Sequence, residues 1–533
     1  MIHINVHSNH SLLSGTSTIN ELVDKAVSFN MNSLCLTDTN GMYGLISFAK
    51  RAIEKGIKPI FGAYIDEPNN SSSYVIILAK NDSGYSDLCK IITSRKLNDD
   101  FTLKNIVKKF KDLFIITPDV NLLEIAKDNK NIFGELILTP SYKSHCRLVY
   151  DYCIKNRIKY IASNPIYFNN PEDYELHKIV TAIGLNTTVS NLKEDEITDS
   201  DFYFADPKEL IKKCKGIPEA IQNLNYIEDN CNVDLKLHQY KFPNFPSPIY
   251  ETSESMLTRL CYEGAEKKYK VMSAQVIKRL NYELQVIKEM NFVDYFLIVW
   301  DIVKEAQKRG MMFIGRGSAA NSIVAYCIGL TQVDPLEHNL YFERFLNKGR
   351  SSPPDVDIDF SWKERDEIIK YVFDKYGYEN VAMISTHVTF RAKSAFREVA
   401  KVYGFSNDEI TKFSKFIPWT NAKNLLNISN IFPESRSLKF NEEPWISIIK
   451  YASQLADYPR HLSIHPSGII ITPESIVNYV ALEYASNKGL GLIITQPDMY
   501  SIEDLGLIKI DLLSQRSLGV LRDTILDLKA KKK

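Results

Sequence analysis

Paired cysteines, a long apolar run and an excess of charge of one sign are all missing from this 533-residue sequence. The eight cysteines are scattered with no Cys-x-x-Cys pair, which argues against a zinc site or a disulfide framework and for reduced thiols. No apolar stretch is long enough to cross a bilayer, and the first residues lack the regions of a signal peptide, so we expect a cytoplasmic protein without a membrane partner. Because 65 basic residues balance 65 acidic ones, any contact with DNA must come from a local basic surface.

The length and the first part of the chain indicate a multidomain α/β protein. A chain of 533 residues is too long for one core, and the usual domain size suggests about three or four domains. Up to about residue 225, strand-like runs at 2–6, 33–37 and 58–61 alternate with helix-like runs at 19–30 and 43–55. This βαβαβ rhythm predicts an α/β layer or barrel. A Pro-rich linker at 241–248 follows, and then helical patterns at 253–269, 274–290 and 295–309.

The run Pro-Pro-Asp-Val-Asp-Ile-Asp-Phe at 353–360 has the alternation of a β-strand. Asp355, Asp357 and Asp359 would project from one face, where three anions are tolerated only if solvent or cations lie among them. Mg²⁺ prefers such oxygen ligands, and a pair of Mg²⁺ ions is the usual device for phosphoryl transfer. The alternative is an exposed edge strand whose acids keep it soluble. A second strand-like run at 507–513 carries Asp511, which could complete the site or instead cap the segment that follows.

Upstream of the carboxylate strand, a Gly-x-Gly turn leads into a helical run at 323–327. Glycines allow the backbone to approach a phosphate, and the N-terminus of a helix offers unpaired N–H groups. The turn residues that we expect to hold a triphosphate are Gly315, Arg316, Gly317 and Ser318. Arg344 and Arg350, between the turn and the carboxylate strand, are either further triphosphate contacts or salt-bridge partners.

Basic and polar residues after the carboxylate strand are candidates for contacts with nucleotide or DNA. Arg391, Lys393 and Arg397 place at least two cations on one side of a predicted helix, either as a solvated face or as phosphate contacts. His461 and His465 have zinc-like spacing, but no cysteine or second pair lies nearby. We therefore interpret the two histidines as polar or phosphate contacts.

The N-terminal motifs at 3–8, 11–15, 37–44 and 56–62 resemble the PHP domain of polymerases and histidinol phosphatases. In that family these motifs hold a metal cluster. Four positions where ligands are expected carry other residues here: Asn5, Ser14, Thr39 and Tyr64. The run Ser-Asn-Pro-Ile-Tyr at 163–167 replaces a further Asp and His, which leaves His7. The resemblance thus implies a structural PHP domain without metal, phosphatase or proofreading activity; a remodelled phosphoesterase site using His3, His7 and His10 is the alternative.

From residue 279 to 404 the chain resembles the family C DNA polymerases, the alpha subunits of bacterial DNA polymerase III. The motifs at 295–301, 315–322, 342–347 and 354–360 carry this resemblance. By position it implies that Asp357, Asp359 and Asp511 bind two Mg²⁺ ions. The expected deoxynucleotide contacts are Gly315, Arg316, Gly317, Ser318, Arg344, Arg350 and Lys393. The expected contacts with primer-template DNA are Arg391, Arg397, His461 and His465.

The resemblance implies template-dependent addition of deoxynucleotides to a primer 3′-hydroxyl, in DNA replication or in damage-tolerant, translesion synthesis with other replisome subunits. The implied fold is a PHP-type α/β barrel followed by a nucleotidyltransferase-like palm with an inserted helical thumb. The expected boundaries are 1–225 for the PHP domain, 226–250 for a linker, 251–404 and 459–516 for the two parts of the palm, 405–458 for the thumb and 517–533 for the start of truncated fingers or a tail.

Two departures from the family bear on function. The family continues after the palm with fingers and further DNA-binding regions, which this sequence lacks, so it resembles the N-terminal half of such a polymerase. The alternative function is therefore a scaffold, or one half of a split polymerase that needs a second polypeptide carrying the fingers. The motifs at 386–391 and 460–465 resemble the error-prone branch of the family more than the main replicase.

Overall fold

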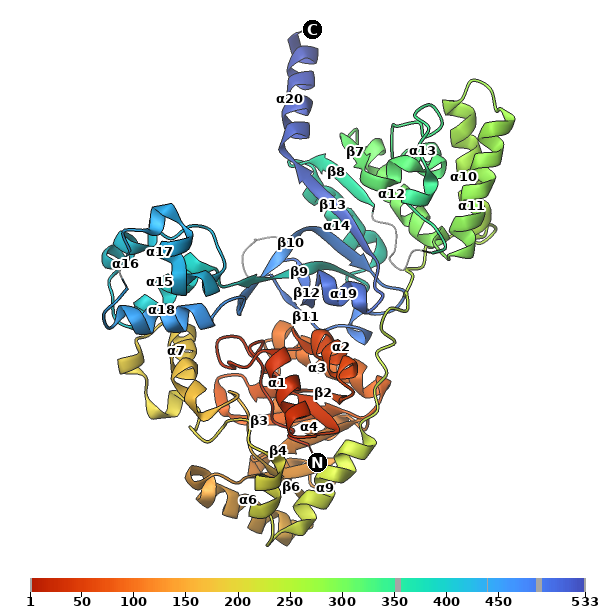
Figure 1. Cartoon of the computed structure of the whole chain (residues 1–533). Helices are drawn as coiled ribbons and strands as arrows, with labels where there is room; N and C mark the ends of the chain where they lie inside the picture. The colour runs from red at the N-terminus through yellow and green to blue at the C-terminus, as the bar shows by residue number, and fades with distance from the viewer. Residues whose placement is uncertain (1, 350–355, 439, 486–490, 532–533) are drawn as a thin grey trace.

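The computed structural model describes residues 2–349, 356–438, 440–485 and 491–531. Figure 1 shows an α/β region at the bottom, a sheet in the centre, a helical unit on one side and further helices on the other. The mixed α/β multidomain fold confirms the fold class that the sequence predicts. Within the described residues, each helix is too short or too polar to traverse a lipid bilayer.

The N-terminal region is a six-stranded sheet whose strands lie side by side in chain order. The strands are β1 (Ser33–Leu36), β2 (Lys58–Glu67), β3 (Asn70–Ala79), β4 (Leu113–Thr117), β5 (Ile132–Ile137) and β6 (Lys159–Ser163). The helices are α1 (Ile19–Ser28), α2 (Leu45–Glu54), α3 (Asp82–Leu97), α4 (Leu103–Lys109), α5 (Val120–Ile125), α6 (Lys143–Asn156), α7 (Tyr174–Leu185), α8 (Pro207–Lys213) and α9 (Pro218–Asn230). Strands β4 and β5 are buried along their whole length, as parallel strands covered on both faces should be.

The predicted strand at 2–6 is wrong, because the structure has only an isolated bridge there, between Val6 and Ile166. The Thr37 N–H donates to the carbonyl of Val6 (2.8 Å), and the His7 N–H donates to the carbonyl of Ile166 (2.8 Å). Residues 5–7 therefore lie between the ends of β1 and β6 and close the curled sheet. Helix α1 begins where predicted because Thr18 and Glu21 form a capping box.

The central sheet has seven strands in the order β11-β12-β9-β10-β13-β8-β7. They are β7 (Phe313–Arg316), β8 (Asp357–Ser361), β9 (Val381–Thr389), β10 (Pro459–Ile471), β11 (Leu482–Tyr484), β12 (Ile493–Asp498) and β13 (Lys509–Gln515). The helices of this region are α10 (Ser253–Lys268), α11 (Ala274–Glu289), α12 (Val293–Lys308), α13 (Ile323–Cys327), α14 (Arg365–Tyr376), α19 (Met499–Asp504) and α20 (Arg516–Lys531). Helices α10, α11 and α12 confirm the three predicted helical patterns.

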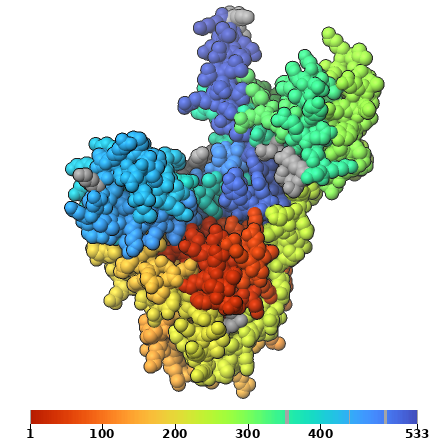
Figure 2. All heavy atoms as spheres, in the orientation of Figure 1, coloured from red at the N-terminus to blue at the C-terminus, as the bar shows by residue number. Residues whose placement is uncertain are grey.

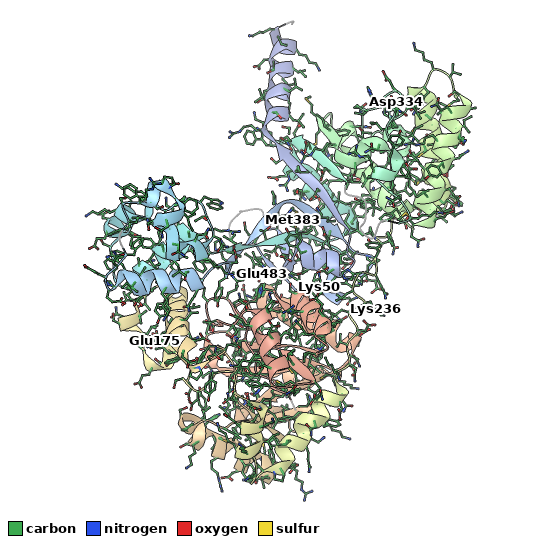
Figure 3. The ribbon with its side chains drawn as sticks, in the orientation of Figure 1. Lys50, Glu175, Lys236, Asp334, Met383 and Glu483 are labelled. Atoms are coloured by element: carbon green, nitrogen blue, oxygen red, sulfur yellow. The ribbon has the colours of Figure 1, made fainter. Side chains whose placement is uncertain are left out.

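A helical unit is inserted between β9 and β10. It comprises α15 (Ala392–Val402), α16 (Asn407–Ser414), α17 (Ile428–Ile431) and α18 (Trp445–Gln454). Its apolar core also includes residues of α7 from the N-terminal region, and Figure 3 places Glu175 of α7 at this junction. Helix α15 packs inside the unit, although the expected boundary put it in the first part of the palm.

The N-terminal region and the central sheet meet in a polar junction around β11 and β12. The Met42 N–H donates to Gln496 Oε1 (2.9 Å), and the Tyr43 hydroxyl donates to Glu483 Oε2 (2.7 Å). Lys50 Nζ pairs with Asp504 at 2.7 Å, and Figure 3 shows Lys50 and Glu483 side by side along this junction. Figure 2 shows the helical unit and α20 as two projections on either side of an open notch.

Candidate active site

Strands β8 and β13 are parallel neighbours, and their register places Asp357 opposite Asp511. Asp359 follows two residues after Asp357, so the pleat directs all three aspartates to one face of the sheet. The other face carries the apolar residues of the two strands, which lie in the core: Ile358, Phe360, Ile510 and Leu512. Because Asp511 lies within β13, the alternative that it caps a following helix is wrong.

Arg316 on β7 supplies a positive charge to the first two aspartates. Its Nε atom lies 3.2 Å from Asp359 Oδ1 and 4.0 Å from Asp357 Oδ2. The Gln515 side chain donates to the other oxygen of Asp359 at 3.2 Å. The Arg316 N–H is not aligned for a hydrogen bond, and Asp359 Oδ1 is buried without a hydrogen-bond partner among the described residues. This oxygen can therefore accept a further cation or donor.

Asp511 is buried and carries its own pair of partners. Lys509, two residues earlier on the same face, places Nζ 2.6 Å from Asp511 Oδ2. The Ser467 hydroxyl donates to Asp511 Oδ1 at 2.8 Å. A lysine and a hydroxyl thus balance a carboxylate that has little access to solvent.

The three aspartates share a face but do not converge on one centre. Within the described ranges, no group of three His, Cys, Asp or Glu side chains is close enough to hold a metal ion. Arg316 and Lys509 hold the carboxylates instead. The three aspartates offer carboxylate oxygens, the type of ligand atom that Mg²⁺ prefers, and one of these oxygens, Asp359 Oδ1, is buried without a hydrogen bond among the described residues. Asp355 lies outside the described residues.

The Gly-x-Gly turn lies beside the aspartates, and its two glycines have different reasons to be there. A Cβ atom on Gly315 would lie 2.0 Å from the carbonyl oxygen of Leu330, so Gly315 is required for packing. Gly317 has a φ of +72°, and a Cβ there would lie 3.4 Å from Asp357 Oδ2. The chain therefore passes close to Asp357 with no side chain between them, while Arg316 is exposed and Ser318 half-buried.

The N-terminus of α13 does not offer the unpaired N–H groups that the turn was expected to provide. The Val324 N–H donates to Glu283 Oε2 (3.2 Å), and the Ala325 N–H donates to Ser322 Oγ (3.1 Å). Ser322 also donates to Glu283, whose carboxyl pKa is raised by burial and whose other oxygen pairs with Arg279 at 2.6 Å. A protein carboxylate thus occupies the anion position at this helix end.

The other predicted nucleotide and DNA residues are spread over three parts of the structure. Arg344 ends the short 3-10 helix η6 (Phe342–Arg344) and is exposed, whereas Arg350 lies outside the described residues. Lys393 is exposed on α15, in the helical unit and not on the carboxylate strands. Arg391 and Arg397 belong to the same unit: Arg391 pairs with Asp457 at 3.2 Å, and Arg397 donates to Ser414 at 3.1 Å.

The two predicted histidines lie on β10. His461 is exposed, whereas His465 is half-buried in the irregular stretch of β10 between Ile464 and Ile469, near Asp511. Partial desolvation lowers the pKa of both imidazoles. His465 Nδ1 accepts the N–H of Gly468 at 2.8 Å, and Gly468 is the register partner of Asp511.

Three residues that hold the aspartates in place were not predicted from the sequence. Arg365 joins the irregular stretch of β10 to β13 by donating to the carbonyls of Leu512 and Pro466, each at 2.7 Å. Lys509 could have been found, because it precedes Asp511 by two residues in the same alternation. Ser467 could not, because it lies 44 residues from Asp511 in the chain.

The residues of the expected PHP metal site form a buried hydrogen-bond network. His7 Nε2 lies 2.9 Å from Asn5 Oδ1, and its Nδ1 lies 3.1 Å from Thr39 Oγ1. Asn5 in turn donates to Glu135 Oε1 at 3.0 Å. Burial lowers the pKa of His7 to about 3, so this imidazole is neutral at physiological pH.

The chain matches two known families along its length. Residues 3–149 match the PHP domain, and residues 255–514 match the bacterial DNA polymerase III alpha NTPase domain. The DNA polymerase III subunit alpha of Bacillus subtilis is 33% identical over 547 residues, which cover 98% of this chain and 49% of the relative. The corresponding subunit of Borreliella burgdorferi is 33% identical, with the same two shares.

An error-prone DNA polymerase of Symbiobacterium thermophilum is 29% identical, and the match covers 98% of this chain and 52% of that relative. The chain thus spans about half the length of the curated relatives it matches. The two matched ranges include strands β1 to β5 of the curled sheet and the strands that carry Asp357, Asp359 and Asp511. The chain therefore contains a PHP domain at residues 3–149, followed by the bacterial DNA polymerase III alpha NTPase domain at residues 255–514.

Proposed function

We propose that the chain carries the catalytic site of a DNA-directed DNA polymerase, which adds deoxynucleotides to a primer 3′-hydroxyl. The observation that carries this proposal is the register of β8 and β13, which puts Asp357, Asp359 and Asp511 on one face within the matched polymerase domain. Three carboxylates on adjacent strands are an arrangement suited to phosphoryl transfer. The proposal covers replication and damage-tolerant synthesis, because the matched relatives include both kinds of polymerase.

Mg²⁺ held by Asp357, Asp359 and Asp511 would lower the pKa of the primer hydroxyl and stabilise the charge that develops on the phosphates. Arg316, paired with Asp359 and half-exposed, is available to exchange the carboxylate for a triphosphate oxygen. Lys509 offsets the negative charge of Asp511 in the same way. In the absence of substrate, Arg316 and Lys509 thus offset the repulsion among the three carboxylates.

We assign the incoming deoxynucleotide to the face of the Gly-x-Gly turn. Gly317 leaves space beside Asp357, and Arg316 and Ser318 are accessible polar groups there. Arg344 is an exposed cation that supports the same assignment. Lys393, which lies in the helical unit, and Arg350 are added to the proposal by the sequence resemblance alone. The residues proposed to contact primer-template DNA are Arg391, Arg397, His461 and His465.

Primer extension by the Asp359→Asn variant tests this proposal. Loss of a preorganised charge should lower the extension rate by about 10²–10³-fold, while the thermal unfolding curve stays close to that of the parent. The matched control is Asp374→Asn, on an exposed turn of α14 where Asp374 pairs with Lys370. An Asp359→Asn variant that extends primers within about tenfold of the parent would refute the site assignment.

A second candidate is a half-polymerase that needs a separate chain carrying the fingers. Helix α20 favours it, because this helix projects from the rest of the structure (Figure 1) with exposed apolar side chains. These side chains are Val520, Leu521, Leu526 and Leu528. The same extension assay separates the candidates when the unmatched half of the Bacillus subtilis relative is added as a second polypeptide. Primer extension that occurs only in the mixture supports the half-polymerase. Primer extension by the chain without the second polypeptide rules it out.

A further inference from the structure

We infer that the PHP region holds a binding site for a small organic cation, an alkylammonium ion, in a cavity walled by aromatic rings. The cavity has a volume of about 450 Å³ and opens beside the hydrogen-bond network of His7. Its wall includes four tyrosines and a phenylalanine: Tyr64, Tyr74, Tyr142, Tyr167 and Phe202.

The rings of this wall form a continuous series. Tyr64 stacks on Tyr74 with centroids 4.3 Å apart, and His7 stacks on Tyr167 at 4.0 Å. His7 also meets the edge of Tyr64 at 5.3 Å, which joins the two stacks. Phe202 extends the series, 6.2 Å from Tyr167 and 5.5 Å from Tyr142. Aromatic faces carry a negative quadrupole, so several rings around one cavity favour a cation.

The charged side chains around the cavity are acidic, so their charge is negative like the potential at the ring faces. Glu135 lies beneath the wall, buried, and accepts the hydroxyl of Tyr74 at 2.7 Å. Asp195 and Glu196 line the cavity and are exposed to solvent. Among the described residues that line it, none is a lysine or an arginine. The described lining of the cavity is therefore electronegative and includes no lysine or arginine to neutralise it.

The imidazole of His7, which stacks on Tyr167 of the wall, does not change this balance. Burial lowers the pKa of His7 to about 3, so its ring is neutral. His145 lines the cavity, and its Nε2 lies 3.0 Å from the carbonyl oxygen of Pro118. Burial and the nearby Glu135 raise the pKa of the Tyr64 and Tyr74 hydroxyls well above the usual range, which keeps both rings uncharged.

An alkylammonium ion fits these features better than a nucleotide or a hydrated metal ion. A phosphate would meet Asp195 and Glu196 as like charges. A divalent ion requires converging oxygen ligands, but Glu135 already accepts three hydrogen bonds, from Asn5, Tyr74 and Ser163. An alkylammonium ion places its methyl or methylene groups against ring faces and its charge toward the acids.

Calorimetric titration of the whole chain with tetramethylammonium and with 1,4-diaminobutane tests the inference. We expect saturable binding of at least one probe. Glu196→Lys should weaken it by about tenfold or more, because a cation would then stand at the cavity mouth. The matched control is Glu194→Lys, an exposed residue of the same short 3-10 helix (Glu194–Glu196) that does not line the cavity, and it should leave affinity unchanged.

The aromatic wall is tested by Tyr167→Leu, with Tyr484→Leu as the control at an exposed tyrosine. Loss of binding in Tyr167→Leu supports the inference if its thermal unfolding matches the parent; if the variant unfolds, the Glu196→Lys result decides. The inference is overturned by an absence of saturable binding of both probes. It is equally overturned by equal affinity in Glu196→Lys and Glu194→Lys, or by binding of Mn²⁺ or a deoxynucleoside monophosphate that displaces the probe from this cavity.

Discussion

At the scale of single residues, the charge of Asp511 depends on one lysine of its own strand. Lys509 Nζ lies 2.6 Å from the carboxylate, and both side chains are mostly buried. Removing one partner of a buried ion pair leaves the other charge buried without compensation. The free-energy cost of that unpaired charge is larger than the net stabilisation that the pair provides. We therefore predict that Lys509→Met lowers the free energy of unfolding by about 3–5 kcal/mol in chemical denaturation without divalent metal.

Added Mg²⁺ should restore part of this loss, because an ion that binds the folded carboxylates stabilises the folded state by mass action. The control is Lys363→Met, which removes an exposed pair with Asp523 and should cost at most about 1 kcal/mol. Equal losses in the two variants, or an Lys509→Met variant that Mg²⁺ leaves unchanged, would contradict the role given to Asp511.

The aspartates could be predicted from the sequence because alternation is a local signal. Asp357 and Asp359 share a face by their spacing alone, and the isoleucines on either side of Lys509 point to the same conclusion for Asp511. Their partners could not be predicted, because they depend on pairing between distant strands. Arg316 meets Asp359 only because β7 pairs with β8.

At the scale of elements, strand β7 is held in place by the absence of one side chain. Gly315 lies against the carbonyl of Leu330, where a Cβ would come within 2.0 Å of the oxygen. Gly315→Ala must therefore displace β7 or the segment around Leu330, at a cost of about 1–3 kcal/mol in the free energy of unfolding. Because β7 carries Arg316, primer extension should fall as well.

Gly216→Ala is the matched control, because no atom lies within 4 Å of the added methyl group. Its free energy of unfolding should be unchanged or slightly higher, since alanine restricts the unfolded chain. Thermal and denaturant unfolding of both variants provide the measurement. A Gly315→Ala variant as stable as the parent would show that the Leu330 segment can move without cost.

Long periodic helices were predicted well because their signal repeats over many residues. Helices α10, α11 and α12 begin within two residues of the predicted positions. Two other predictions failed for a tertiary reason. The run at 2–6 has strand character but finds a partner at Val6 alone, and the N-terminus of α13 is capped by Glu283, about 40 residues away.

At the scale of the whole molecule, three histidines of the N-terminal region are buried and a fourth, His10, is partly buried; the buried ones are His3, His7 and His177. Burial lowers the pKa to about 4 in His3 and His177 and to about 3 in His7 and His10. The folded protein thus binds protons less tightly than the unfolded chain, whose imidazoles titrate near 6.5. The contribution of these histidines to stability is full above pH 6.5 and is lost as the pH falls from 6.5 toward 3.

We predict that each of these histidines removes about 2–3 kcal/mol between pH 6.5 and pH 4.5, at 1.36 kcal/mol per pKa unit. His7→Gln should flatten the pH dependence of the free energy of unfolding by that amount over this interval. His338→Gln, at an exposed position, is the control and should leave the curve unchanged. The hypothesis fails if the two variants show the same slope.

The order of the regions along the chain could be predicted from the motifs, but the junction between them could not. Met42 and Gln496 are 454 residues apart, and nothing local to either residue indicates that they are hydrogen-bonded. The same holds for Lys50 and Asp504, which are equally far apart. Such contacts depend on how two folded surfaces fit together.

Helix α7 belongs to the N-terminal region by chain order and to the helical unit by packing. Ile179 and Val180 lie in one apolar core with Ala395 and Phe396 of α15. A gene that lost the codons for its first 185 residues would encode a helical unit with part of its core exposed. Selection on the folding of that unit would therefore act against the loss of α7, whether or not the N-terminal region retains chemistry of its own.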